Sequence, residues 1–317
     1  MKKKPAAPRR VRPSAAPESP PDFAPAARPK RHYGWKPQPA DHRDFRFAPS
    51  RALVASAPPK FSLLPTMPAP VDQGQLGSCG PNSADILLMF DQGAEKLSYH
   101  GSSRLFTYYI TRAAMGTVGQ DSGVDNRTML KALAQAGYCP DESLWPYDIS
   151  KFTQQPPQSA YDLAAQNKIV SYAAVGQDLA SMKAAILSGF PFLFGFSVYP
   201  EFESPQVART GVVPMPMPGE RSIGGHDIVL FGWDDATQTF DFMNPWGAGW
   251  GVNGTGKIPY AYATNPRLSG DFWVINAVPG APEPTPPPGP VNPVPPSPGA
   301  FSVTLSIDPA TKKVTQV

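Results

Sequence analysis

The chain has 317 residues, with 28 Lys and Arg against 25 Asp and Glu and a formal net charge of +3. Its 41% hydrophobic content is enough for a sizeable core, and its length suits one two-lobed domain or two small domains. No stretch approaches the ~18 apolar residues of a membrane span. The positive charge belongs to the first 31 residues, so the remainder gives no reason to expect nucleic acid as a partner.

Residues 1–31 are predicted to be a disordered tail. They contain nine Lys and Arg, two acidic residues, and many Pro and Ala. The opening MKKK is typical of a signal peptide, but no apolar segment of about 7–15 residues follows it, which argues against a Sec signal. The tail is therefore interpreted as a solvated linker or as an export signal for a non-Sec route. The localisation stays open between the cytoplasm and such a route.

Residues 32–47 differ in character from the tail. Tyr33, Trp35, Phe45 and Phe47 are too apolar for a free tail, and prolines keep the middle of the segment extended. We expect this segment to dock on the folded body of the protein. Residues 48–70 are expected to be a connecting loop.

Residues 71–78 are predicted to be a loop that leads into a helix, with Cys79 at the junction. Pro81 suits the first helical turn, and the apolar run at 84–90 predicts a buried helix that continues to about Leu97. A cysteine at a helix N-terminus faces the positive end of the macrodipole, which favours the nucleophilic thiolate. The alternative for a single cysteine is a buried structural thiol.

Two further helices are predicted in the first half of the chain. Residues 104–114 are rich in aromatic side chains that should face the core, and residues 125–136 have Asp125 as N-cap and Gly137 as stop signal. Cys139 is expected to be a lone buried or loop thiol. Two cysteines without framework spacing fit a reducing compartment or a scaffold that needs no disulfide.

The second half of the chain is predicted to be mainly β. The expected elements are strands at 169–175, 192–199, from 226 onward, 239–244 and 271–275, and a helix at 179–189 capped by Asp178. A hairpin turn at 234–238 would bring Asn244 back beside His226. Residues 200–222 are expected to be a loop, and the strand-like run in 301–317 is too short to fold alone.

Cys79, His226 and Asn244 follow one another in an order that suits nucleophilic catalysis. A thiol nucleophile needs a base to take its proton, and the base needs an orienting group; Cys/His/Asn is one known form. Taken singly, His226 would be a core histidine and Asn244, before a proline, a turn residue. Cys79, Cys139 and His226 lack zinc-ligand spacing, and no phosphate-binding loop is present. We therefore expect neither metal nor cofactor.

These motifs resemble those of the papain-family cysteine peptidases of bacteria. The residues that carry the likeness are Gln73 with GSC at 77–79, GGH at 224–226 and NPWGAGWGVNG at 244–254. The family has a Gln six residues before its nucleophilic Cys, as Gln73 stands before Cys79. Its Asn is followed two residues later by Trp, as Asn244 is by Trp246. The likeness covers roughly residues 60–278.

The resemblance implies an α+β fold with a mainly helical first lobe, an antiparallel β second lobe and an active site in the cleft between them. The implied organisation is a basic tail at 1–31, a propeptide-like segment and connector at 32–60, a peptidase domain at 61–278, a proline-rich linker at 279–300 and a short tail at 301–317. Residues 32–47 should then partly block the cleft; the alternative is a strap that only stabilises a lobe.

The implied function is that of a cysteine endopeptidase that hydrolyses peptide bonds through a thioester. The implied site residues are Cys79, His226 and Asn244 for catalysis, Gln73 in the oxyanion hole, Trp246 in support, and Gly123 and Gly225 in substrate binding. The expected partner is a peptide or protein substrate, the expected state is a monomer, and no metal is implied.

Two departures from the family pattern bear on substrate preference and efficiency. The family usually has a bulky aromatic residue after the nucleophile, where this chain has Gly80, and a small apolar residue after the histidine, where this chain has Asp227. Two alternative functions are a catalytically silent papain-like binding module and a relative that transfers the acyl group to an amine. Silent modules commonly lose the Cys, His or oxyanion Gln, all of which this chain retains.

Overall fold

The computed structural model describes residues 31–39, 41–49, 57–94 and 101–277, and two short strands, β8 (Leu305–Ile307) and β9 (Val314–Gln316). The predicted tail at 1–31, apart from Arg31, and the predicted linker at 279–300 lie outside the described residues, as does the predicted helix end near Leu97. The run predicted in 301–317 contains not one strand but two, which pair antiparallel.

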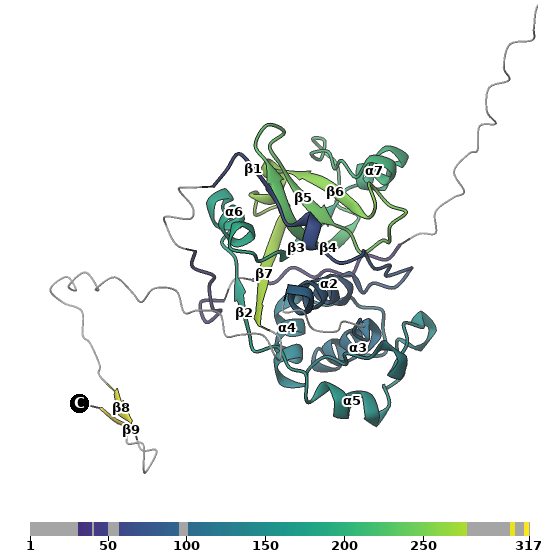
Figure 1. Ribbon diagram of the computed structural model, residues 1–317. Helices are drawn as coiled ribbons and strands as arrows, with labels where there is room; N and C mark the ends of the chain where they lie inside the picture. The colour runs from purple at the N-terminus through teal and green to yellow at the C-terminus, as the bar shows by residue number, and fades with distance from the viewer. Residues whose placement is uncertain are drawn as a thin grey trace, which may run out of the picture. The chain divides into compact units, whose positions relative to one another are not determined.

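Helices are the main regular elements of the first half of the described chain. They are α2 (Cys79–Ala94), α3 (Arg104–Ala114), α4 (Asn126–Gln135) and α5 (Gln158–Ala164), with short 3-10 turns η1 (Leu64–Thr66), η2 (Glu142–Leu144) and η3 (Ile149–Lys151). In Figure 1 these four α-helices lie together on one side of the sheet. The helical first lobe was predicted correctly.

The second half is built on a seven-stranded sheet in which every strand pairing is antiparallel. Its strands are β1 (Lys60–Ser62), β2 (Ser171–Ala174), β3 (Phe192–Val198), β4 (Gly224–Asp234), β5 (Thr239–Met243), β6 (Thr255–Pro259) and β7 (Ser269–Ala277). The order is β2-β7-β3-β4-β5-β6, with β1 paired to β4. The helical elements of this half are α6 (Leu179–Leu187), η4 (Pro200–Glu203), α7 (Pro205–Thr210) and α8 (Tyr260–Ala263).

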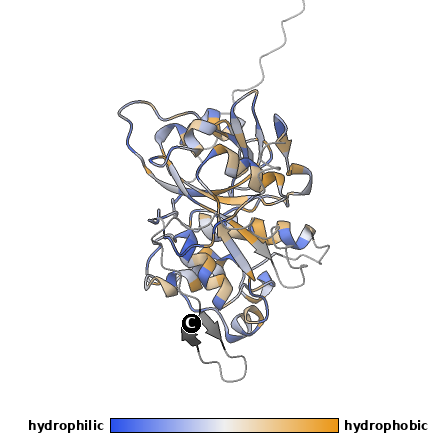
Figure 2. Ribbon diagram, turned by 90° about the vertical axis from the view of Figure 1, so that its left-hand side faces the viewer, coloured by the Kyte–Doolittle hydropathy of each residue, from blue (hydrophilic) through white to orange (hydrophobic). Residues whose placement is uncertain are grey.

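Helix α2 connects the helical lobe to the sheet. Every residue from Cys79 to Phe90 is buried, and apolar residues of α2 share one core with α3, α4 and the strands β3, β4 and β7. Each fully buried Leu or Ile contributes about 1.5–3 kcal/mol. The hydropathy colouring of Figure 2 shows hydrophobic residues along these central strands. The buried helix fixes the position of its first residue, Cys79, against the sheet.

The predicted helix boundaries agree with the structure where a local capping signal exists. The Asp125 side chain accepts a hydrogen bond from the Thr128 N–H at the start of α4, and Gly137 follows the helix with φ of +89°. Asp178 caps α6 in the same way. Such caps are encoded within one helical turn, and the sequence therefore reveals them.

Two expected loops contain elements that were not predicted, and the strand after Trp246 was not predicted either. Residues 48–70 include β1, residues 200–222 include η4 and α7, and residues after Trp246 include β6. For α7 the sequence did carry a signal, because Ser204 accepts from the Val207 N–H as its N-cap and Gly211 ends it with φ of +70°. Among the described residues, no helix has the length and hydropathy required to cross a bilayer.

Candidate active site

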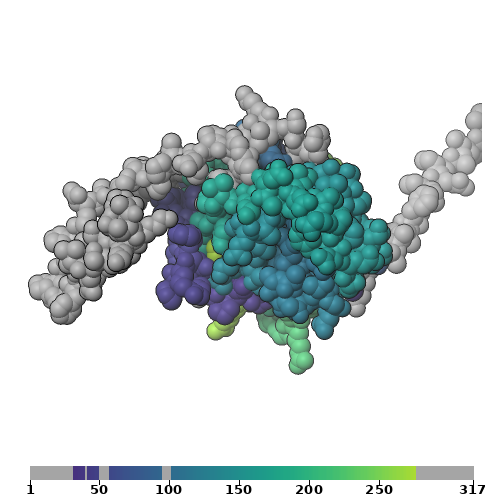
Figure 3. All heavy atoms as spheres, turned by 90° about the horizontal axis from the view of Figure 1, so that it is seen from below, coloured from purple at the N-terminus to yellow at the C-terminus, as the bar shows by residue number. Residues whose placement is uncertain are grey.

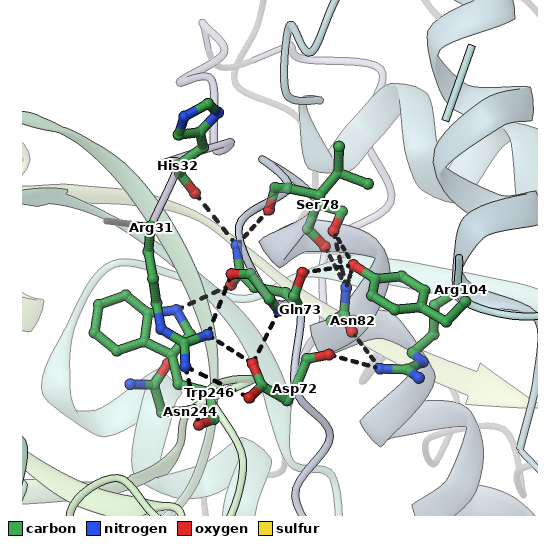
Figure 4. A network of polar contacts seen from close by, with 12 residues as sticks. Arg31, His32, Asp72, Gln73, Ser78, Asn82, Arg104, Asn244 and Trp246 are labelled. Carbon is green, nitrogen blue, oxygen red and sulfur yellow. Dashed lines mark hydrogen bonds and ion pairs between the residues drawn. The ribbon is translucent and has the colours of Figure 1, made fainter. Parts of the chain in front are cut away.

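The loop before α2 holds the Gln73 side chain in one orientation. Gln73 is fully buried, and its backbone N–H donates to the Pro245 carbonyl at 2.9 Å. Its Oε1 accepts from the Trp246 indole N–H at 3.1 Å, and its Nε2 donates to the Leu76 carbonyl at 2.8 Å. The amide nitrogen therefore faces away from Trp246, as Figure 4 shows.

His226 lies on β4, and Asn244 follows the neighbouring strand β5. The His226 Nε2 is 2.8 Å from the Asn244 Oδ1. An amide oxygen only accepts, so Nε2 carries the ring proton and Nδ1 presents a lone pair. Nδ1 is buried and has no hydrogen-bond partner within the described part of the chain. An oriented imidazole with a free lone pair can take a proton from a nearby nucleophile.

Trp246 contacts both His226 and Gln73. Its ring centroid lies 4.9 Å from that of His226, and the indole is 5% exposed. Through its N–H it also fixes the oxygen of the Gln73 amide. The sequence predicted a supporting position beside His226 and Asn244 but not the bond to Gln73.

A second polar network holds the loop that carries Gln73. The sequence did not predict this network. The Tyr147 hydroxyl donates to the Gln73 carbonyl at 3.0 Å and accepts from Asn82 Nδ2 at 3.1 Å, and it also bonds the Ser78 hydroxyl. The Arg104 guanidinium stacks 4.1 Å from the centroid of the Tyr147 ring. Figure 4 shows Ser78, Asn82 and Arg104 beside Gln73 in this part of the site. No local motif reveals this network, because its members meet only in the folded chain.

The described residues of 31–49, called the N-terminal segment below, run between the two lobes. The Trp35 N–H donates to the Gly225 carbonyl at 2.9 Å, and the Lys36 N–H donates to the Val124 carbonyl at 3.0 Å. Gly225 belongs to β4, and Val124 lies just before α4. In the space-filling view of Figure 3 this segment is purple and lies against blue and teal atoms of the helical lobe.

The N-terminal segment reaches the side chains predicted to be catalytic. The His32 carbonyl accepts a hydrogen bond from Gln73 Nε2 at 3.3 Å. A backbone hydrogen bond from Gly34 is directed at the Cys79 thiol. The group that would donate to an oxyanion and the group that would attack a carbonyl are thus both in contact with the segment.

Two side chains of the segment hold its beginning in place. The Tyr33 ring lies edge-on to the His226 ring at 5.9 Å, and its hydroxyl bonds Glu203. Arg31 forms an ion pair with Asp72 at 2.6 Å. Contacts from both sides of the cleft therefore fix this end of the segment.

One part of the docking prediction for residues 32–47 was wrong. Phe45 is 79% exposed, whereas Trp35 is buried and Phe47 packs on Phe190. The chain here is extended beside Ala174, which donates its N–H to the Phe45 carbonyl and accepts from the Phe47 N–H. Residues two apart on an extended strand lie on the same side, so alternation does not account for the exposure of Phe45, which lacks the ring contact that Phe47 makes with Phe190.

The predicted substrate contacts Gly123 and Gly225 both lie under the segment. Gly123 has φ of +69°, and a Cβ there would lie 2.1 Å from the Gly34 carbonyl oxygen. The Gly225 carbonyl accepts from Trp35. The principal backbone partner on the helical side is Val124, whose N–H donates to Gly34 at 2.7 Å. Sequence reasoning did not identify Val124.

The ionisation state of Cys79 differs from the expected one. The sequence predicted a thiolate favoured by the helix dipole, but burial, with a further contribution from Asp227, raises the pKa of the Cys79 thiol to about 12. Backbone hydrogen bonds from Gly34, Asp227 and Gly80 oppose this rise in pKa without reversing it. Desolvation outweighs the dipole because the sulfur is fully buried.

The same burial acts on the imidazole. It lowers the pKa of His226 to about 3, although the hydrogen bond to Asn244 acts in the opposite direction. A neutral Cys79 thiol and a neutral His226 imidazole are therefore both favoured while the N-terminal segment covers them. The ion pair expected from the sequence requires that both groups regain solvent or a charged partner.

The two departures from the family pattern meet in space. A Cβ on Gly80 would lie 2.9 Å from Val124 Cγ2 and 3.5 Å from Asp227 Oδ2. The small residue after Cys79 thus leaves room for Val124, and the carboxyl after His226 lies within van der Waals distance of the same position.

Cys139 lies away from this site. It is fully buried and packs in a separate apolar cluster with Phe106. Cys79 and Cys139 are both free thiols. Within the described ranges no group of three or more His, Cys, Asp or Glu side chains could hold a metal ion.

Comparisons with known proteins identify related chains. An uncharacterised peptidase C1-like protein of Acanthamoeba polyphaga mimivirus is 38% identical over 231 residues, which are 69% of this chain and 73% of that protein. A cathepsin B-like cysteine proteinase of Caenorhabditis elegans is 31% identical over 123 residues, which are 38% of this chain and 35% of that protein. No protein-family model matches the chain.

A solved structure agrees over most of the described fold. Xylellain, a cysteine protease from Xylella fastidiosa, superposes with a TM-score of 0.72 at 36% identity, and the match covers 78% of this chain and 97% of that one. Digestive procathepsin L 3 of Tenebrio molitor larval midgut superposes with a TM-score of 0.55 at 16% identity, covering 72% and 73% of the two chains. The latter likeness concerns the fold alone.

Proposed function

The chain belongs to the papain-like cysteine peptidases, and from this premise we propose that it hydrolyses peptide bonds with Cys79 as nucleophile, His226 as acid and base, and Asn244 as orienter. The single observation that carries the proposal is the hydrogen bond from His226 Nε2 to Asn244 Oδ1, which leaves the Nδ1 lone pair free. A core histidine without a catalytic role would be expected to have both ring nitrogens satisfied.

The proposed reaction proceeds in two halves. The Cys79 sulfur transfers its proton to His226 and attacks the scissile carbonyl, so that a C–S bond forms and an oxyanion develops. His226 then protonates the leaving amine as the C–N bond breaks, which gives a thioester. In the second half His226 takes a proton from water, the resulting hydroxide attacks the thioester, and the acid product leaves as Cys79 regains its proton.

Gln73 is proposed to stabilise the oxyanion together with the Cys79 backbone N–H. The Gln73 Nε2 already donates to a carbonyl oxygen, that of His32. Removal of one such donor typically costs about 2.7–4 kcal/mol of transition-state stabilisation. Trp246, which fixes the amide oxygen, and Tyr147, which bonds the Gln73 carbonyl, would keep the donor aimed at this position.

The N-terminal segment is proposed to restrain the enzyme rather than serve as its substrate. The Cys79 thiol accepts a backbone hydrogen bond from Gly34 of the segment. The bridge between Trp35 and Val124 is parallel. Because burial keeps the thiol protonated and the imidazole neutral, the covered site lacks the reactive thiolate.

The test of this function combines a thiol-directed epoxide with two matched substitutions. The native sequence, Cys79→Ala and Cys139→Ala are each prepared with and without residues 1–56. Without those residues, we expect hydrolysis of a fluorogenic peptide and a single epoxide adduct by intact mass for the native and Cys139→Ala chains only. Equal loss of activity from both substitutions, or an adduct on Cys139, would contradict the assignment of Cys79.

A further inference from the structure

The Asp121 carboxylate joins two loops that border Cys79, and we propose that Asp121 is a positioning residue for peptide hydrolysis. The inference rests on the proposed peptidase function and adds a residue to it. Residues 73–78, called the nucleophile loop below, lead to Cys79. Residues 117–124, called the edge loop, lead to α4 and contact the N-terminal segment through their last residue, Val124. Asp121 would fix the position of one loop relative to the other.

The first contact of Asp121 holds the nucleophile loop. Both carboxylate oxygens accept from the Gly77 backbone N–H, at 3.0 and 3.1 Å. A hydrogen bond to an ionised acceptor is stronger than one between neutral groups. A Cβ at position 77 would lie 3.0 Å from Asp121 Oδ1, so glycine permits the close approach. Because Gly77 stands two residues before Cys79, this contact restricts the turn from which the thiol projects.

The second contact reaches the edge loop through Tyr108 of α3. The Tyr108 hydroxyl donates to Asp121 Oδ1 and accepts from the Gly123 N–H at 3.1 Å. A phenolic hydroxyl has one proton to donate, and the bond to Asp121 directs its lone pairs toward Gly123. The Tyr108 residue is fully buried, which restricts its rotation. Asp121 therefore holds Gly77 directly and Gly123 through one intermediate.

A buried guanidinium holds the backbone just before Asp121. The Arg112 Nη1 donates to the Val118 and Gln120 carbonyls at 2.7 and 2.9 Å. The guanidinium carbon also lies 4.0 Å from the centroid of the Tyr108 ring. Burial lowers the pKa of Arg112, and the charges of Tyr108 and Asp121 oppose that change. The cation and the carboxylate thus stabilise each other, and both are attached to the edge loop.

The edge loop ends where peptide backbone is bound. The Val124 N–H donates to the Gly34 carbonyl at 2.7 Å, and its carbonyl accepts from the Lys36 N–H at 3.0 Å. The same Gly34 directs a backbone hydrogen bond at the Cys79 thiol. An extended substrate bound in this way would take its register from the edge loop, whereas the position of the sulfur is set by the nucleophile loop.

Hydrolysis depends on how these two loops are placed. A displacement of about 1 Å between reacting groups can cost about 10²-fold in rate. Without the Asp121 carboxylate, the Gly77 N–H and the Tyr108 O–H would lose their common acceptor. We expect the loss to fall on kcat, because alignment of the sulfur with the carbonyl carbon matters most in the transition state.

The alternative role for Asp121 is to hold the N-terminal segment. His32 Nδ1 lies 2.8 Å from Asp121 Oδ2, and loss of this contact alone should loosen the segment and speed hydrolysis. The positioning role predicts the opposite sign for Asp121→Ala. His32→Ala is therefore a matched control, because it removes the contact with the segment and leaves the contacts with Gly77 and Tyr108.

The kinetic test uses full chains that carry Arg31→Ala, which removes an ion pair of the segment. On a fluorogenic peptide, Asp121→Ala should lower kcat at least about tenfold with KM within about threefold, whereas His32→Ala should keep or raise kcat. Asp121→Asn should retain at least about a third of kcat, since its amide oxygen can still accept from both donors. A rise in kcat with Asp121→Ala, a change confined to KM, or equal losses for Asn and Ala would overturn the proposal.

Tyr108→Phe tests the connection to Gly123 in the same background. Alone it should lower kcat/KM about threefold or more, and added to Asp121→Ala it should cost less than about a further twofold, because the connection is already broken. Tyr109→Phe is the control, since Tyr109 packs on a separate apolar cluster of the helical lobe, and it should cost less than about twofold. Additive losses for Tyr108→Phe and Asp121→Ala would overturn the connection through Tyr108.

Amide hydrogen exchange distinguishes failure of this proposal from failure of the proposed function. In the full chain without Arg31→Ala, Asp121→Ala should speed exchange of the Gly77 and Gly123 amides at least about fivefold, and Tyr108→Phe that of Gly123 only. NMR of the labelled protein measures both. Unchanged exchange at both glycines with Asp121→Ala would overturn the proposal even in an active peptidase. If exchange responds as expected and no chain hydrolyses peptide, the link between the loops stands and the proposed function is wrong.

Discussion

The charge on the Cys79 sulfur depends on two effects of opposite sign. Its position at the first residue of α2 favours the anion, whereas full burial favours the protonated thiol and raises its pKa to about 12. Part of this burial comes from the N-terminal segment, which contacts the thiol through Gly34. Removal of the segment should therefore lower the pKa of the thiol and restore the dipole as the larger effect.

This balance predicts a pH dependence for thiol alkylation. Below a pKa of about 12 the thiolate fraction rises about tenfold per pH unit, so Cys79 in the native chain should react slowly at pH 7 and progressively faster up to pH 10. The chain that begins at residue 57 should react rapidly from mildly acidic pH with little further rise. Intact-mass time courses with iodoacetamide measure both profiles. Equal rates at pH 7 would contradict the proposed effect of the segment.

Gln73→Ala tests the proposed oxyanion donor. We expect kcat to fall by roughly 10–10³ with a modest change in KM, because the donor acts mainly in the transition state. Gln92→Ala serves as control, since the Gln92 amide bonds the Tyr138 hydroxyl rather than the active-site loop. Steady-state kinetics on one peptide measure both. A change confined to KM would make Gln73 only a substrate contact.

At the scale of elements, a helix or strand can be predicted when the residues that determine its limits are close to it in the sequence. Helices α4 and α6 have their Asp caps within three residues of the groups they bind, and their limits were predicted to within about two residues. Strand β1 has three residues and exists because it pairs with the end of β4. Its partner is distant in sequence, so a window of neighbouring residues cannot reveal it.

The same distinction applies to the candidate site. The predictions for Cys79, His226 and Asn244 rest on motifs of contiguous residues. Tyr147 and Asp121 act through contacts with residues far along the chain, and no motif marks them. The raised pKa of the Cys79 thiol could likewise not be predicted from the sequence, because it depends on burial in the folded chain.

The Asp178 cap gives a test of local stability. Asp178→Ala removes the acceptor for the Ser181 N–H at the start of α6 and should destabilise the protein by about 0.5–2 kcal/mol. For a domain of this size about 1 kcal/mol corresponds to a fall of roughly 2–4 °C in Tm. Asp162→Ala is the control, because the Asp162 side chain bonds only Gln158 on the surface of its own helix in the described hydrogen bonds. Thermal unfolding followed by circular dichroism measures both; equal shifts would exclude a capping role.

At the scale of the whole molecule, the N-terminal segment connects the two lobes. Its Asp44 pairs with Arg127 of α4, and its Arg46 forms a bridge with Ala174 of β2. At its other end, Arg31 pairs with Asp72 and lies 4.9 Å above the Trp246 ring. A segment fixed at both ends and on both lobes should restrict opening of the cleft as well as access to it.

Removal of the segment should therefore raise peptidase activity. A chain that begins at residue 57 retains β1 and its pairing with β4 and should cleave a small peptide at least about tenfold faster than the full chain. An added peptide of residues 31–49 should inhibit it. Activity assays with and without the peptide measure this. A less active truncated chain and an inert peptide would make the segment a structural strap.

Two arginines of the segment provide the matched control for that experiment. Arg31→Ala removes an ion pair with the body of the protein, whereas the Arg43 guanidinium bonds only Asp41 within the segment in the described contacts. Arg31→Ala should speed both alkylation and hydrolysis in the full chain, and Arg43→Ala should change neither by more than about twofold.

The covalent link between segment and cleft has a consequence for dilution. Because both belong to one chain, the effective concentration of the segment at the cleft does not change with protein concentration. A single cut between residue 49 and β1 would convert the segment into a separate ligand that obeys ordinary mass action. Dilution would then disperse it, and the covered state would not return. While the chain between residue 49 and β1 is intact, the restraint by the segment does not depend on protein concentration. Once that connection is cut and the segment diffuses away, the restraint is lost irreversibly.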